Sequence, residues 1–121
     1  MAELAGKRFE SPDEVREFLD GKGRVELVDL NGHVVGRGIF EPGWRWSEHV
    51  KPIAGTDSCQ VEHIGYVVDG SMTLHMDDGT ERTFGPGDTF HMPPGHDAWT
   101  VGDEACVVLD FGGLKGYAKA G

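Results

Sequence analysis

The sequence predicts a single all-β domain, a small sandwich or barrel of short strands preceded by one short helix. Three observations predict this fold class. Short runs of β-branched and aromatic residues recur along most of the chain, turn signals such as Asp69-Gly70 and Pro94-Gly95 separate them, and Asn31-Gly32 marks a tight hairpin. Short strands at this spacing are typical of sandwiches and barrels. The 121 residues suffice for one hydrophobic core, so we expect one domain over residues 1–121.

The expected helix covers about residues 12–20. Ser11 is a typical N-cap, and a proline and two acidic residues follow it in the first turn. Val15, Phe18 and Leu19 then repeat at i, i+3 and i+4, which gives the helix one apolar face. We expect this face to pack against a sheet.

After the helix the pattern changes to that of β-strands, and we expect the barrel core over about residues 24–111. Apolar and polar residues alternate up to Leu30, and the Asn31-Gly32 turn sends the chain back. We expect residues 51–58 to form a loop and the glycine-rich tail, residues 112–121, to be mobile. The expected strands cover residues 24–30, 33–40, 44–49, 60–68, 72–76, 81–84, 89–92, 98–101 and 105–111.

The composition excludes several classes of function. The formal net charge of −10 argues against nucleic-acid binding, because contacts to phosphates need clustered Lys and Arg. No apolar run approaches the roughly 20 residues that span a bilayer, and the N-terminus lacks the apolar segment of a secretory signal. Two cysteines, Cys59 and Cys106, are too few for a disulfide framework. We therefore expect a cytoplasmic protein that binds neither nucleic acid nor membrane.

Two clusters of histidine, glycine and proline are the candidates for a functional site. The first runs from Gly43 to His49 and resumes at His63, and the second ends at His96. The short strands between them could bring these distant histidines together inside one small barrel. Neutral imidazole is the commonest protein ligand of transition metals, so three convergent imidazoles would make a metal site.

The two clusters resemble the two motifs of the cupin superfamily, whose fold is a small jelly-roll β-barrel. The first motif has a glycine, five residues and a histidine, as in Gly43 to His49. The second has a glycine, five residues, a proline, any residue and a glycine, which Gly87, Pro93 and Gly95 supply. The resemblance is to small single-domain cupins, and it implies a divalent transition metal bound in the barrel.

The chain departs from the cupin metal set at three positions. Lys51 stands where a second histidine is usual, and His63 stands where the motif has a glutamate. Ala98 occupies the usual place of the last histidine, whereas His96 directly follows the motif's glycine. The resemblance therefore predicts an altered metal site made of His49, His63 and His96.

Strand alternation indicates which residues converge, because neighbouring side chains point to opposite faces. If His63 faces the interior, Val67 shares its face, while Ile64, Tyr66 and Val68 point outward. A contiguous exposed apolar face usually marks an interface, and cupin-like proteins commonly dimerise. We therefore expect a homodimer in which a second copy covers this face. The alternative is that the N-terminal helix covers it.

The same alternation places Arg45 on the face of His49. An inward guanidinium would bind a substrate carboxylate, although an exposed arginine is an equal alternative. Tyr66 and His91 are further candidates for substrate binding. Other residues near the expected ligands could replace one of them, namely Cys59, Glu48 and Asp97.

Two functions are compatible with these residues. The first is a metal-dependent enzyme, of dioxygenase, isomerase or lyase type, that acts on a small organic molecule in the barrel around Fe, Mn, Zn, Ni or Cu. The second is a non-catalytic module that binds or senses a metal or small ligand. A scaffold whose interior is filled with side chains is a third interpretation.

Overall fold

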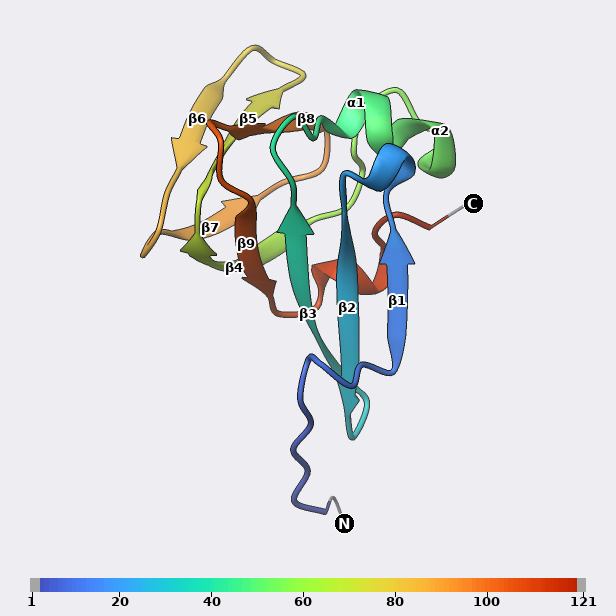
Figure 1. The fold of residues 1–121 in the computed structure, drawn as a ribbon. Coiled ribbons are helices and arrows are strands. Elements are labelled where there is room, and N and C mark those ends of the chain that lie inside the picture. Colours follow the sequence, from blue (N-terminus) through green and yellow to red (C-terminus); the bar gives the residue numbers. More distant parts are fainter. Residues whose placement is uncertain (1–2, 120–121) are drawn as a thin grey trace.

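The computed structural model describes residues 3–119, whose strands form two separate antiparallel sheets rather than one closed barrel (Figure 1). The larger sheet has the order β1 (Glu14–Glu17), β2 (Gly23–Leu30), β3 (His33–Phe40), β9 (Cys106–Asp110), β4 (His63–Asp69), β7 (Thr89–Met92). The smaller sheet has the order β6 (Glu81–Phe84), β5 (Ser71–Met76), β8 (His96–Val101). The all-β, jelly-roll type of fold expected from the sequence is confirmed.

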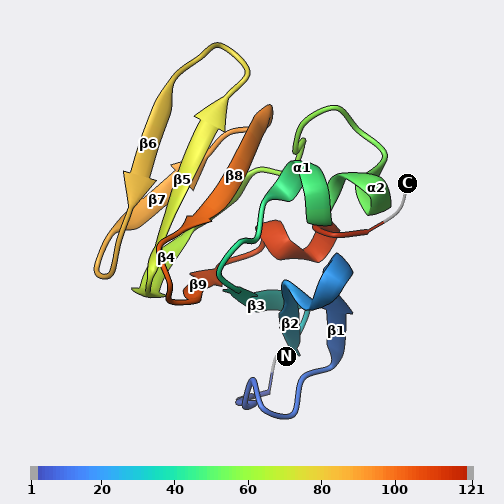
Figure 2. The ribbon, with the colours of Figure 1, turned by 45° about the horizontal axis from the view of Figure 1, so that its top comes forward.

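The hydrophobic core lies between the two sheets (Figure 2). Both sheets contribute buried side chains to it because each strand turns alternate residues inward. On β4 the inward residues are His63 and Val67, while Ile64, Tyr66 and Val68 are exposed, as the alternation predicts. Other core residues include Val25, Phe40, Val108, Met72, Leu74 and Ala98.

The hairpin between β2 and β3 forms at the predicted position. Asn31 and Gly32 have φ values of 56° and 89°, and a two-residue turn of this kind requires positive φ at both positions. The register then runs without a break from Leu30 opposite His33 to Gly23 opposite Phe40. Strands β6 and β7 also begin and end where the sequence predicts.

The helix expected over residues 12–20 is absent. Residues Glu14–Glu17 form β1, which pairs with β2, and Leu19–Gly21 form a short 3₁₀ helix, η1. Hydrogen bonds from the Asp13 N–H to the Leu27 carbonyl and from the Asp29 N–H to the Asp13 carboxylate extend this pairing. Pairing with the edge of β2 therefore decides the conformation of this segment, against its helical pattern of apolar residues. Of the three residues in that pattern, Phe18 is buried and the other two are exposed.

Residues expected to form a strand and a loop form two short helices instead. Trp46–His49 is α1, and Lys51–Ala54 is α2, which ends at Gly55 with φ of 78°. The Asp97 carboxylate accepts the Ser47 N–H at 3.0 Å and so stabilises the first turn of α1. No helix within residues 3–119 is long and apolar enough to cross a membrane.

The C-terminal segment, residues 113–119, packs against the sandwich instead of forming the expected mobile tail. It begins with the 3₁₀ helix η2 (Gly113–Gly116), which contacts β2, β3 and β4 and lies beneath α1 (Figure 2). Leu114 and Tyr117 are buried, and the Arg16 guanidinium donates to both of their carbonyls. Residues 120–121 of the expected tail lie outside the described residues.

Candidate metal centre

Within the described residues, Cys59, His63 and His96 form a group that could hold a metal ion. All three side chains are buried, and one ligand atom from each lies within 4.8 Å of the other two. The Cys59 Sγ is 3.8 Å from the His63 Nε2, and the two imidazole rings are 5.6 Å apart at their centroids. We call these three residues the Cys-His-His group.

Backbone pairing places the thiol beside the second histidine. The Cys59 N–H donates to the His96 carbonyl at 2.7 Å, and the Gly95 N–H donates to the Cys59 carbonyl at 2.7 Å. This isolated bridge joins the chain before β4 to the start of β8. The group therefore sits where the two sheets come together.

Both imidazoles are oriented by a hydrogen bond at Nδ1. The His63 Nδ1 lies 2.6 Å from the Asp110 Oδ2, and the His96 Nδ1 lies 2.8 Å from the Pro93 carbonyl oxygen. Because both oxygens are acceptors, each Nδ1 carries the proton. The Nε2 atom of each ring is then left with the lone pair that a metal needs.

The buried setting favours the uncharged forms of Cys59 and His96. Burial, together with the smaller effects of the nearby Asp110 and Asp97 carboxylates, raises the pKa of the Cys59 thiol to about 11. Burial also lowers the pKa of His96. A bound cation would reverse the effect on Cys59, because a coordinated thiol loses its proton.

The spacing of the group fits a metal with sulfur and nitrogen ligands. Zn–S and Zn–N bonds in a tetrahedral site place sulfur and nitrogen about 3.6 Å apart. The observed distance from Cys59 Sγ to His63 Nε2 is 3.8 Å. The three side chains would supply three ligands and leave a further position for another molecule.

The Cys-His-His group lies between two spaces of different size. The first, the inner cavity, has a volume of about 30 Å³ and lies between the sheets, where His63 and His96 form part of its wall. The second, the outer groove, has a volume of about 230 Å³ and is lined by Cys59 and Lys119. Trp46 and Tyr117 line both spaces.

The structure brings together two of the three predicted ligands, His63 and His96, but not His49. The His49 Nδ1 accepts the Arg45 N–H at 3.0 Å, and its Nε2 lies 3.9 Å from the Asp20 carboxylate. His49 belongs to α1, and the helix turns its ring back on its own first turn. The prediction that His49 points inward assumed the alternation of side chains in a strand, which does not apply in a helix.

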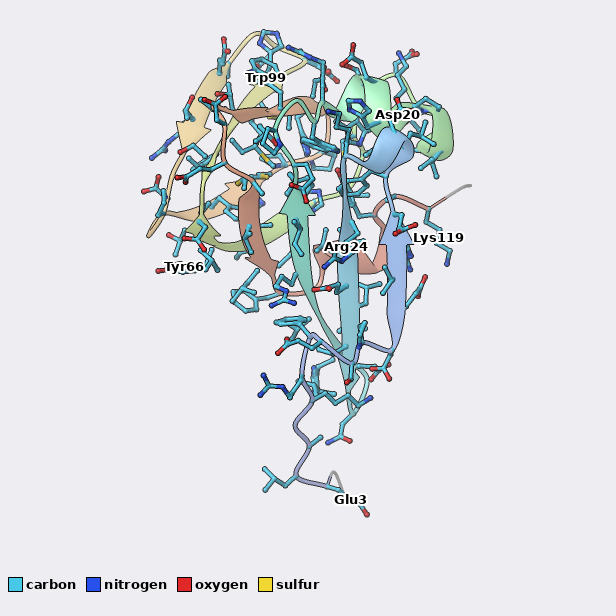
Figure 3. All side chains as sticks on the ribbon, viewed as in Figure 1. Glu3, Asp20, Arg24, Tyr66, Trp99 and Lys119 are labelled. Carbon is cyan, nitrogen blue, oxygen red and sulfur yellow. The ribbon has the colours of Figure 1, made fainter. Side chains whose placement is uncertain are left out.

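The residues predicted to bind substrate line neither the inner cavity nor the outer groove. The Arg45 guanidinium lies 4.4 Å from the centroid of Trp99 and 3.9 Å from the Asp97 carboxylate. Tyr66 and His91 lie on the outer face of the larger sheet, where the His91 Nε2 is 2.9 Å from the Glu62 carboxylate. Figure 3 shows Tyr66 and Trp99 at the outside of the molecule.

Of the alternative ligands, only Cys59 joins the group. Glu48 is exposed on α1, and Asp97 supports the first turn of that helix. Two important neighbours of the group were not predicted, Asp110 and Tyr117. Asp110 follows Val108 on the inward face of β9, so an acidic residue at an inward position was the available signal. Nothing in the glycine-rich tail pointed to Tyr117.

The cupin domain family matches residues 49–112, more than half of the chain. The chain belongs to the cupin family. The resemblance inferred from the glycine, histidine and proline motifs is thereby confirmed. No curated protein matches this cupin.

Solved structures show the same fold. An RmlC-like cupin from Shewanella frigidimarina is 17% identical with a TM-score of 0.58, covering 91% of this chain and 92% of its own. A cupin-like protein from Thermotoga maritima is 22% identical with a TM-score of 0.57, and the match covers 91% of this chain and 84% of that protein. A variant of oxalate decarboxylase from B. subtilis is 17% identical with a TM-score of 0.58, covering 87% of this chain and 28% of its own. At these identities the likeness of this cupin to them shows the fold alone.

Proposed function

We propose that this cupin binds a divalent transition metal through Cys59, His63 and His96 and is a metal-dependent enzyme acting on a small organic molecule. The observation that carries the proposal is the orientation of the two imidazoles. The Asp110 carboxylate and the Pro93 carbonyl accept hydrogen bonds from the two Nδ1–H groups, so the Nε2 lone pairs of both rings are left beside the thiol. Hydrogen bonds of this kind usually accompany histidines that bind metal.

The donor set narrows the choice of metal. A thiolate and two imidazoles suit Zn, Fe, Cu and Ni, whereas Mn prefers oxygen ligands. A bound metal would supply a Lewis acid or a redox centre, which fits dioxygenase, isomerase and lyase chemistry.

The outer groove is the place for an organic substrate. Its volume of about 230 Å³ suits a small molecule, and Cys59 brings the metal site to its wall. Lys119 lines the same groove and would pair with a substrate carboxylate, the role expected of Arg45 from the sequence. The buried rings of Trp46 and Tyr117 would keep water from the inner side of the site.

Metal analysis of matched cysteine variants tests the proposal. We expect stoichiometric metal in the wild type and in Cys106→Ala, and little in Cys59→Ala. Both cysteines are buried and free, but only Cys59 belongs to the group. The cobalt-loaded protein should show a thiolate-to-cobalt absorption band that Cys59→Ala lacks. A wild type that takes up no metal after reconstitution would refute the proposal. If metal is bound, oxygen consumption with a panel of small acids and phenols tests for turnover.

A second candidate is a non-catalytic module that binds or senses a metal or small ligand. The packing of the C-terminal segment on the group favours this function. Tyr117 lies edge-on against His63 at a centroid distance of 5.2 Å, so a ligand at the group would act directly on that segment. Absence of turnover in protein with full metal occupancy would favour this candidate over an enzyme.

We further propose a homodimer in the cytoplasm. The outer face of the larger sheet exposes Ile64 and Phe111 by more than half of their surface, beside Tyr66 and Val68. A second copy would cover this apolar face. The two free, buried thiols agree with a reducing compartment.

A further inference from the structure

Trp44 carries a buried hydrogen-bond donor that lacks a partner. Its side chain is 2% exposed, and among the described residues its Nε1 is the buried side-chain polar atom that has no acceptor. The ring packs against Phe40 and Phe18 at centroid distances of 4.5 and 5.7 Å, and neither ring offers an oxygen. Buried donors in folded proteins are nearly always paired, so an unpaired one suggests that a ligand or water supplies the acceptor.

The inner cavity is the space that could hold this acceptor, because Trp44 forms part of its wall. Its volume is about 30 Å³, whereas one water needs about 10–15 Å³. A molecule of two heavy atoms therefore fits, but a sugar, a phenol or an organic acid does not.

Most residues that line the inner cavity are apolar, and its polar groups come from His63, His96, Asp110, Tyr117 and the two indoles. Phe40, Met72, Met92 and Val108 surround it, while His63 and His96 contribute from the metal-binding side. Apolar cavities tend to exclude water and admit apolar guests. The cavity thus suits a weakly hydrated diatomic molecule that can accept one hydrogen bond.

We propose that the inner cavity binds a diatomic ligand of the dioxygen and nitric oxide class, held between the metal at the Cys-His-His group and the indole N–H of Trp44. The inference rests on the proposed function, because the metal would bind one end of the ligand. Trp44 is a positioning residue that donates to the other end. An organic molecule in the outer groove and a diatomic ligand in the inner cavity would then approach the same metal from opposite sides.

Nitric oxide binding to the iron(II)-loaded protein under anaerobic conditions tests the proposal. Metal content is measured first, and the iron–nitrosyl complex is then followed by its absorbance and electron paramagnetic resonance. We expect complex formation in the wild type and roughly tenfold weaker binding in Trp44→Phe, the effect of one lost hydrogen bond. Trp99→Phe is the matched control, because that ring lies on the outside against Arg45, and its affinity should not change.

A cavity-filling variant tests the location independently of Trp44. Ala98 is buried and lines the inner cavity but is outside the group. We expect Ala98→Ile to retain iron and lose the nitrosyl complex, with Val108→Ile as the second variant if the first does not fold.

The outcomes separate this proposal from the proposed function. A wild type that binds iron but no nitric oxide, or binds it as tightly in Trp44→Phe and the filled variant, would overturn the diatomic site and leave the metal site standing. The diatomic site would also be overturned by a crystal structure of iron-loaded protein, exposed to nitric oxide, in which Trp44 Nε1 donates to an ordered water only. A wild type that binds no iron would refute both the metal site and the diatomic site, and the metal analysis shows this before nitric oxide is added.

Discussion

The carboxylate of Asp110 lies 2.6 Å from the imidazole of His63, and both side chains are buried. The second carboxylate oxygen accepts the N–H of Gly113 at 2.8 Å. One acidic residue at the end of β9 therefore orients the imidazole that begins β4 and anchors the C-terminal segment. This contact links the candidate metal centre to the part of the chain that covers it.

Asp110→Asn should weaken metal binding by about 10- to 100-fold, because the amide no longer fixes the tautomer and orientation of His63 as a carboxylate does. Competition with a chromogenic chelator measures the change. Glu62→Gln is the matched control, since Glu62 pairs with His91 on the outer face. Equal metal affinity in Asp110→Asn and the wild type would show that the contact has no role in metal binding.

Substitution of single histidines separates the ligand set predicted from sequence from that suggested by the structure. His63→Ala should lower metal occupancy sharply, because it removes one of the three ligand atoms. His49→Ala should leave occupancy unchanged, because this ring bonds to Arg45 instead. Elemental analysis of both purified variants measures this. A loss of metal in both variants would favour the ligand set predicted from the sequence.

Gly113→Ala should destabilise the fold by roughly 1–3 kcal/mol and reduce metal binding. A Cβ at this position would lie 2.3 Å from the Glu62 carbonyl oxygen and 2.9 Å from the His63 Nδ1. The C-terminal segment must then move away from the His63–Asp110 contact. Thermal unfolding and chelator competition measure the two effects. Gly6→Ala, at an open position, should change neither, and a Gly113→Ala protein with wild-type behaviour would contradict the role given to this contact.

Metal affinity should rise with pH. Burial raises the pKa of the Cys59 thiol to about 11, so the free protein binds this proton throughout the neutral range and the metal complex releases it. One released proton changes the affinity by about tenfold per pH unit, with weaker binding at lower pH. Calorimetry in buffers with different ionisation enthalpies counts the protons. Binding without proton release would mean that Cys59 stays a thiol and is not a ligand.

Ile64→Lys should convert a dimer into a monomer. Ile64 is 56% exposed on the apolar outer face, and a second copy would have to bury the added charge. Sedimentation at micromolar concentration compares the variant with the wild type. His75→Lys, on the smaller sheet, is a control that should remain dimeric. A monomeric wild type would exclude the homodimer.

Features that depend on neighbouring residues could be predicted from the sequence. The β2–β3 hairpin follows from Asn31-Gly32, because those residues adopt positive φ at little cost. The inward position of His63 and the outward position of Tyr66 follow from strand alternation. Motif spacing indicated the cupin family, and of the three ligands predicted from the two clusters, His49, His63 and His96, the structure brings together the last two.

Only the tertiary structure decided which side chains share the site. Residues 14–17 became a strand because β2 offered an edge to pair with, and His49 turned away because Asp97 supports a helix at its position. Cys59 joins His96 through a bridge between segments 37 positions apart, and Asp110 and Tyr117 come from the far end of the chain. Local pattern favours a conformation for each segment, but the conformation adopted and the neighbours of its side chains depend on which distant surfaces can be buried together.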